Sequence, residues 1–206
     1  GCLVLGNEQD NLDGGYVVSE THFGDYAEVL VFNTFLNEAE RIIVSNYLSS
    51  KYLISIDASV DYYQYDVFYG YDVAGIGRAS GVSNVHDAAM SADILQLENA
   101  GDLDNDEYAL FGHDNGDVSV WSSTEVPGGS SSIQRIDRKW RMDETGDVGT
   151  VDIVVDVSSL PTLPVSFSKY ALLVDEDGDF SSGSSIYELS LDAGTNYKST
   201  GVDIPN

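Results

Sequence analysis

Positive charge is scarce in this 206-residue sequence, in which nine Lys and Arg residues face 35 Asp and Glu residues. The formal net charge of -26 repels nucleic acid and anionic membranes, so neither is expected as a partner. Such a surface suits divalent cations or a saline environment, or it serves solubility alone. Composition therefore excludes two classes of partner without choosing a function.

Cysteine and long apolar runs are also scarce. Cys2 is the single cysteine, which excludes an internal disulfide, and its apolar surroundings favour a buried, inert thiol. No run approaches the roughly 20 apolar residues of a membrane helix, so no membrane insertion is expected. Many Gly, Tyr, Ser and Asp residues fit a secreted or cell-surface β protein, and we expect a processed or excised piece of a longer one.

Catalytic motifs are missing as well. The sequence has no Gly-x-Ser-x-Gly, no His-Glu-x-x-His and no phosphate-binding loop. The three histidines, His22, His86 and His113, are scattered and lack the spacing of metal ligands. We therefore expect a protein without catalytic activity.

One long helical pattern is present, over residues 37–51. Asn37 is a candidate N-cap, and Glu40 three residues later completes a capping box. Ala39, Ile43 and Tyr47 fall on one face of this helix. Residues 27–32, just before it, alternate in a way that predicts a strand.

Short strand patterns separated by turn signals fill the second part of the chain. They predict a mostly-β fold, an antiparallel jelly roll or β-sandwich with the one helix covering it. Trp140 is expected in the core, flanked by arginines that point outward and pair with some of the 35 carboxylates. The predicted strands are 92–98, 107–113, 117–121, 133–144, 149–157, 169–175, 185–191 and 196–203.

Tyrosines are dense just after the helix. They stack on sugar rings, or they pack between the helix and the second part of the chain with their hydroxyl groups in water. The second interpretation is favoured. The residues are Tyr62, Tyr63, Tyr65, Tyr69 and Tyr71.

Two acidic loops predict calcium binding, because calcium takes carboxylate and carbonyl oxygens from loops of this kind. The first holds Glu8 and Asp10 before a Gly14-Gly15 turn. The second places Asp175, Asp177 and Asp179 at alternate positions after a predicted strand. The alternative for each is a solvated, charge-rich turn.

The first loop lies in a stretch with a family resemblance. Residues 1–10, Gly14-Gly15-Tyr16 and Phe23-Gly24-Asp25 resemble the calcium-loop region of pentraxins and, more broadly, laminin-G and concanavalin-like jelly rolls. The resemblance implies a calcium site whose ligands are Glu8, Gln9, Asp10 and Glu20. It also implies that residues 1–57 are the C-terminal part of a lectin-like jelly roll, including its closing helix.

A second resemblance covers the rest of the chain. Residues 72–78, 107–116, 135–142 and 145–151 resemble a β domain that follows lectin-like domains in surface proteins of marine and gliding bacteria. This implies a β-sandwich domain over residues 58–206, and it brings no known activity.

Together these observations predict a non-catalytic extracellular module of a bacterial surface adhesin or fibre, binding calcium and a glycan or another surface. The alternative is a structural, self-assembling filament or stalk subunit that neighbouring chains complete by strand exchange. Open strand edges recruit such partners.

Overall fold

The computed structural model describes residues 19 and 21–205, and the chain forms two compact units, Gly1–Phe35 and Leu36–Asn206. In the first unit, the prediction of a strand over residues 27–32 is wrong, because these residues form no strand. The side chains of Val29, Leu30, Val31 and Phe32 are all at least 40% exposed. Alternation fixes a strand only where one of its faces is buried, and that burial is missing here.

The predicted helix is confirmed as α1, Glu38–Tyr52. Its capping box is complete: the Glu40 amide donates to Asn37 Oδ1, and the Asn37 amide donates to Glu40 Oε2. The helix ends at Leu53, which adopts a left-handed conformation with φ 52°. Its buried face holds Ala39 and Ile43 as expected, but continues through Asn46 rather than Tyr47.

The first sheet has four antiparallel strands in the order β2-β1-β5-β6. A short helix, α2 (Asp66–Tyr69), precedes it. Gly77 on β1 faces Tyr108 on β5, and it leaves the space that the tyrosine ring occupies. The strands are β1 (Tyr71–Arg78), β2 (Val85–His86), β5 (Glu107–His113) and β6 (Trp140–Thr145).

The second sheet has six antiparallel strands in the order β3-β4-β7-β10-β9-β8. Its central strand β7 (Val151–Asp156) buries Val151 and Ile153 on one face, as the alternation of Val151, Ile153 and Val155 with Asp152, Val154 and Asp156 predicts. The other strands are β3 (Ala88–Ser91), β4 (Leu95–Glu98), β8 (Tyr170–Val174), β9 (Ser185–Ala193) and β10 (Asn196–Val202).

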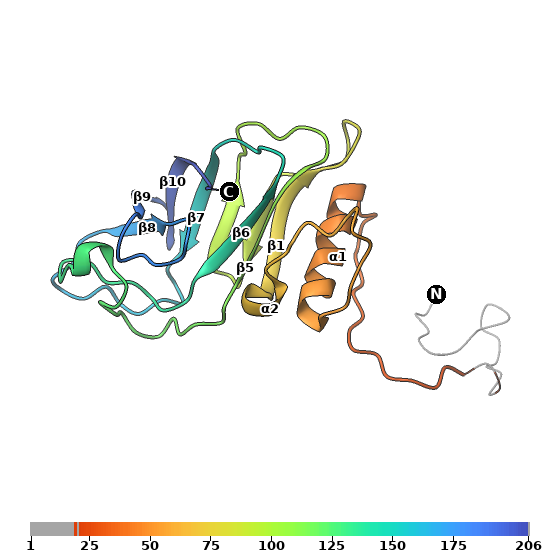
Figure 1. Ribbon diagram of the computed structural model, residues 1–206, viewed down its shortest axis with the longest axis horizontal. Coiled ribbons are helices and arrows are strands. Elements are labelled where there is room, and N and C mark those ends of the chain that lie inside the picture. The colour runs from red at the N-terminus through yellow and green to blue at the C-terminus, as the bar shows by residue number, and fades with distance from the viewer. Residues whose placement is uncertain (1–18, 20, 206) are drawn as a thin grey trace. The chain divides into compact units, whose positions relative to one another are not determined.

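Figure 1 shows α1 beside β1 of the first sheet. Two cores hold the helix and the two sheets together. The larger lies between the two sheets and includes Phe111 of β5 and Ile153 of β7. The smaller lies between α1 and the first sheet, where Ile43 meets Tyr63 and Leu110. The β-sandwich with one covering helix is thus confirmed. Among the described residues, no helix is long and apolar enough to cross a bilayer.

The helix belongs with the sheets. The sequence places it at the end of a first part, 1–57, followed by a sandwich over 58–206. In the structure α1 packs on β1 and belongs to the unit Leu36–Asn206. The assignment of residues 1–57 to a lectin-like jelly roll stays a prediction. The buried face of α1 has its partners in the sandwich, which local sequence patterns do not show.

Most strand predictions agree with the structure, and one region does not. β5 matches its predicted range, and β7, β8, β9 and β10 lie within two residues of theirs. Residues 117–121 and 133–139 form no strand, apart from an isolated bridge between Ser122 and Arg135. They belong to a long β5–β6 connection that contains the short helix η2 (Pro127–Gly129).

Candidate functional site

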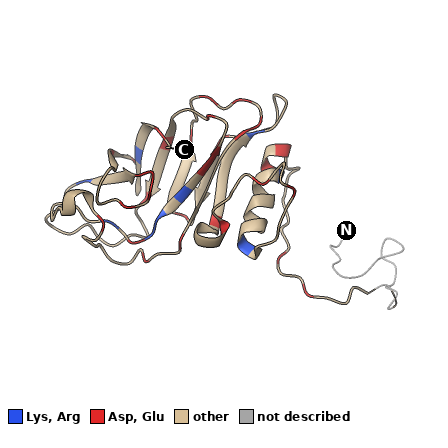
Figure 2. Ribbon diagram, in the orientation of Figure 1, with Lys and Arg blue, Asp and Glu red and all other residues tan. Residues whose placement is uncertain are grey.

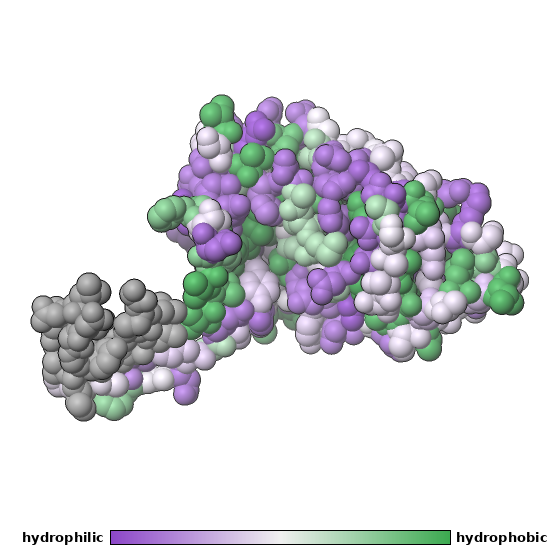
Figure 3. Space-filling view, turned by 180° about the vertical axis from the view of Figure 1, so that it is seen from behind, coloured by the Kyte–Doolittle hydropathy of each residue, from purple (hydrophilic) through white to green (hydrophobic). Residues whose placement is uncertain are grey.

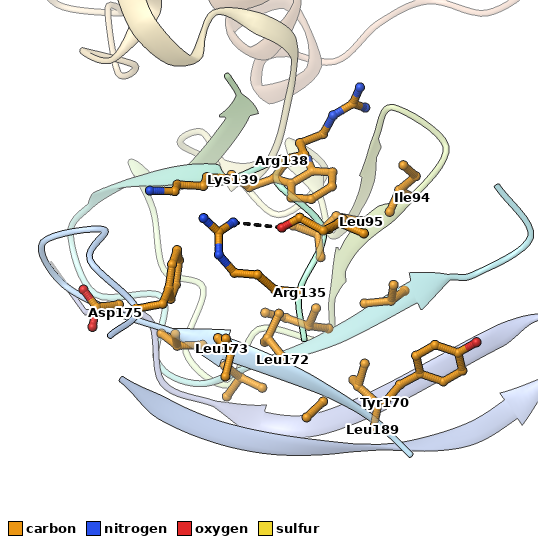
Figure 4. Close-up of a pocket in the computed structure, with 18 of the residues that line it drawn as sticks. Ile94, Leu95, Arg135, Arg138, Lys139, Tyr170, Leu172, Leu173, Asp175 and Leu189 are labelled. Carbon is orange, nitrogen blue, oxygen red and sulfur yellow. Dashed lines mark hydrogen bonds between the residues drawn. The ribbon is translucent and has the colours of Figure 1, made fainter. Parts of the chain in front are cut away.

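A cavity of about 450 Å³ opens between the two sheets on the side where β6 and β8 are the outermost strands. Its size lies within the range of roughly 300–1,000 Å³ that ligand pockets show. Figure 4 shows lining residues spread along β8, from Asp175 at one end to Tyr170 at the other. Apolar side chains form its floor, among them Leu95, Leu172 and Leu189.

The strand edges border this cavity directly. Every residue of β8, from Tyr170 to Val174, lines it, and so do Trp140, Arg141 and Met142 of β6. Neighbouring residues of a strand point to opposite faces, so a cavity that touches consecutive residues lies against the strand's edge. Each of these two strands is paired on one side only.

Cations gather here. Five of the chain's nine Lys and Arg residues line the cavity, against three acidic residues in the described part. Figure 2 shows positive residues on β6 and on the loop that leads into it. The five are Arg135, Arg138, Lys139, Arg141 and Lys169.

Two of these cations share one carboxylate. Arg135 Nη2 lies 2.6 Å and Lys139 Nζ 2.7 Å from Glu125 Oε2. The hydrogen bond from Lys139, followed by the charges of both cations, holds the pKa of Glu125 below its usual range. Both cations also lie over the Phe180 ring, 5.5 and 5.7 Å from its centroid. Asp137 Oδ1 also lies 3.9 Å from Arg135 Nη2, so these two cations face two carboxylates. The group is therefore a fixed part of the wall, and in Figure 4 Arg135 projects between Lys139 and Leu172.

Arg138 and Arg141 have no carboxylate partner within ion-pair distance in the described part of the chain. Arg141 donates to the Tyr65 hydroxyl and to the Glu176 carbonyl, each at 2.9 Å. Arg138 donates through Nε to the Gly116 carbonyl at 3.1 Å. Neutral acceptors position both guanidinium groups without cancelling their charges.

Trp140 is half-buried, with one side against the larger core and another on the cavity. Its indole N–H donates to Ser91 Oγ at 3.2 Å. The sequence predicted a core residue rather than a binding position, and the structure gives Trp140 features of both. The Trp140 side chain is part of the cavity wall that β6 contributes.

His113 supports Trp140 from behind. Its ring is 1% exposed, lies edge-on to the Trp140 ring, and places Nε2 3.0 Å from Asp72 Oδ2. The Asn115 amide donates to Nδ1, so the neutral ring carries its proton on Nε2. Burial lowers the pKa of His113, and its hydrogen bond to Asp72 opposes that effect only in part.

Two buried polar atoms of lining residues lack a hydrogen-bond partner in the described part. They are Arg141 Nε, a donor, and Gln134 Oε1, an acceptor. Buried polar groups are nearly always paired, so each such exception calls for an explanation.

The acidic turn after β8 satisfies its own backbone. Asp175 Oδ1 accepts from the amides of Asp177 and Gly178, and Asp177 Oδ1 accepts from the Asp179 amide at 2.8 Å. Asp179 Oδ1 accepts from Ser181 in the same way. Among the described residues, no group of three His, Cys, Asp or Glu side chains could hold a metal ion. The turn is thus built from successive side-chain caps, and calcium there stays a prediction.

The other predicted calcium ligands, Glu8, Gln9, Asp10 and Glu20, lie outside the described residues. The resemblance to the pentraxin calcium loop therefore stays a prediction as well.

The tyrosines largely join the helix to the sheet. Tyr63 is 3% exposed, and its hydroxyl donates to the Tyr69 carbonyl at 2.9 Å. The Tyr62 ring lies 4.7 Å from the Tyr108 ring. Tyr65 and Tyr69 differ, because they reach the cavity. The packing interpretation thus fits Tyr62 and Tyr63, whereas Tyr65 and Tyr69 also face the candidate site.

Sequence reasoning missed the cavity, since its wall comes from distant segments. The connection between β5 and β6 spans residues 114–139, but the strands predicted over 117–121 and 133–144 concealed its length. Connections longer than about 12–15 residues without their own secondary structure are commonly functional. This one supplies Trp121, Gln134, Arg135, Arg138 and Lys139 to the site.

Fold and site together define a helix-covered β-sandwich with a cationic cavity between its sheet edges. Residues 40–206 match the family described as Domain of unknown function (DUF8202), so the chain belongs to that family. No curated protein and no solved structure matches the chain. The family match includes most of α1, in agreement with the packing of the helix on the sandwich.

Proposed function

We propose that this chain is a non-catalytic binding module of an extracellular bacterial surface protein, and that its cavity holds an apolar ligand with negative charge. One observation carries the proposal. A chain with a net charge of -26 places five of its nine cations around one apolar cavity. Predominantly apolar pockets with a few convergent polar groups are typical ligand sites.

The charge arrangement favours an anion over a neutral ligand. An acidic surface repels anions in general, so a local surplus of cations is the exception that admits them. The guanidinium groups of Arg138 and Arg141 are held by neutral acceptors and keep their full charge. Their attraction acts beside a low-dielectric wall, where charges interact more strongly than in bulk water.

The test uses two dyes that share a ring system, anilinonaphthalene sulfonate and the uncharged phenylnaphthylamine. We expect the sulfonate to bind, and Arg138→Gln/Arg141→Gln to weaken its binding about tenfold at low salt. The control Arg41→Gln/Lys51→Gln removes two charges from α1, outside the cavity, and should change binding little. Equal weakening by both double variants, or no binding of the sulfonate, would refute the proposal.

A calcium-dependent glycan site is the second candidate. Asp175 and Asp177 border the cavity at one end of β8 (Figure 4). An aromatic pair, Trp121 and Tyr170, lines it at the other end, with ring centroids 6.2 Å apart. Carboxylates for calcium and aromatic rings for stacking are both used in sugar sites. Binding to a glycan array that is lost when a chelator is added would favour this candidate. Binding that persists in the presence of the chelator would exclude it.

A further inference from the structure

The occupant of the cavity has to suit two strand edges, since β6 and β8 border it along consecutive residues. An edge strand presents backbone N–H and C=O groups that another strand can pair with. β8 offers its whole length, Tyr170–Val174, and its partner on the other side is β9 alone. An extended peptide fits this border, because it can pair with β8 while side chains on one of its faces enter the cavity.

The unpaired polar atoms distinguish a peptide from other anionic apolar ligands. The lining residues supply one buried donor, Arg141 Nε, and one buried acceptor, Gln134 Oε1, that lack partners in the described part. A fatty acid or alkyl sulfate has acceptors only and would leave the amide oxygen unpaired. A peptide carries an acceptor and a donor in every residue, so it offers both kinds of partner.

Charge complementarity defines the peptide further. The border that faces β8 carries Arg141, which has no carboxylate within ion-pair distance in the described part, and Lys139, which Glu125 partly offsets. Lys169, directly before β8, is already paired with Glu188 at 2.7 Å. Side chains of an added strand alternate between two faces, so acidic side chains on the face that enters the cavity would meet Arg141 and Lys139, and apolar side chains would lie on the other face.

From these three observations we infer that the cavity accepts an extended acidic strand of a neighbouring chain, added along β8. This inference rests on the proposed function and names its ligand. Such a contact would join one surface chain to the next through the sandwich.

The experiment measures fluorescence anisotropy with the 206-residue chain and three labelled, acetylated octapeptides. The first alternates valine with glutamate, the second is N-methylated at alternate residues, and the third carries lysine in place of glutamate. N-methylation removes the donors that pair with a strand edge and preserves charge and apolar pattern. We expect the first to bind, and the other two to bind at least about tenfold more weakly.

Variants locate the contact. Arg138→Gln/Arg141→Gln should weaken the binding of the glutamate peptide about tenfold at low salt. The affinity of Arg41→Gln/Lys51→Gln for the same peptide should stay within about twofold of wild type. Equal binding of the N-methylated peptide would overturn strand addition. If anilinonaphthalene sulfonate binds and the glutamate peptide does not, the strand inference is wrong while the proposed function stands. If neither binds, both are wrong.

Discussion

The first sheet is closed on its outer side and left open along one edge, and the two regions are built differently. On the outer side, α1 and the tyrosine segment that follows it cover β1 and β5 with residues close together in sequence. At the β6 edge, the covering comes from distant segments and leaves a cavity of about 450 Å³. The first region is a packed interface in which the uncharged side chain of Asn46 makes the main polar contacts. The second region is a cationic cavity.

The surface shows a related contrast. In Figure 3, which views the molecule from behind, apolar and hydrophilic side chains are interspersed over the face. Single exposed apolar residues are ordinary on protein surfaces. The cavity differs because its apolar residues are contiguous and cations surround them.

Asn46→Ala should have the largest effect, because it removes the polar anchor of the closed region. Asn46 Oδ1 accepts from the amides of Tyr62 and Tyr63, and Nδ2 donates to the Ile42 and Val60 carbonyls. Leaving these buried groups unpaired should cost about 3–4 kcal/mol of unfolding free energy.

Urea unfolding measures this cost. Ser45→Ala, one residue earlier and partly exposed, is the matched control and should stay within about 0.5 kcal/mol of wild type. An equal effect of both variants would show that Asn46 is no anchor.

Trp140→Ala tests the wall of the open region. We expect a loss of about 3 kcal/mol, the low end for a large aromatic side chain, because Trp140 already borders a cavity. The same variant should also weaken the binding of anilinonaphthalene sulfonate. Val165 is fully exposed on a loop, so Val165→Ala should change neither stability nor dye binding. Unchanged stability would mean that the indole contributes nothing to the core.

The stabilisation by bound calcium is the next largest expected effect. Binding to the folded state at about ten times the dissociation constant should raise the melting temperature by roughly 3–5 °C. Thermal melts in calcium and in chelator, at equal ionic strength, measure this shift. Asp177→Asn keeps the acceptor for the Asp179 amide and removes the charge, so it should reduce the rise if the turn binds calcium.

Asp57→Asn is its control, because Asp57 caps Ser59 in a similar turn away from the cavity. Identical midpoints with and without calcium would leave the acidic loops as solvated turns.

The smallest effect concerns pH. Burial lowers the pKa of His113 in the folded state, so below its ordinary pKa of about 6.5 the unfolded chain takes up a proton that the folded chain resists. This contribution to stability is therefore present near neutral pH and is lost as the pH falls. Burial raises the pKa of Asp143 and Glu144, which acts in the opposite direction.

Unfolding of wild type and His113→Gln between pH 7 and 5.5 isolates the histidine, because this range extends from about half a unit above its ordinary pKa to about one unit below it. The variant should lose less stability on acidification than wild type does. An equal loss of stability in both proteins would mean that groups other than His113 cause the pH dependence.

Local signals made parts of this fold predictable. The capping box at Asn37 and Glu40 fixes the start of α1 within four residues of sequence, and alternation fixes β7. Residues 133–139 carry the same kind of pattern, yet Arg135 donates to backbone carbonyls of Thr124, Ile136 and Asp137 and holds a loop instead. That outcome depends on contacts between separate parts of the chain.

The site was harder to foresee for the same reason. The cluster Arg138, Lys139 and Arg141 is visible in the sequence, and carboxylate partners were expected for it. Lys139 has one in Glu125, but the two arginines bind neutral acceptors. Their charges become available only because β6 lies at the edge of its sheet, which no local pattern reveals.

Amide hydrogen exchange compares the closed and open regions in one measurement. With the valine–glutamate octapeptide present, amides of β8 should exchange more slowly, and amides of α1 should be unchanged. The result expected is protection over Tyr170–Val174 that Arg138→Gln/Arg141→Gln removes. Unchanged exchange along β8, or equal protection of α1, would contradict a binding site at the open edge of the sandwich.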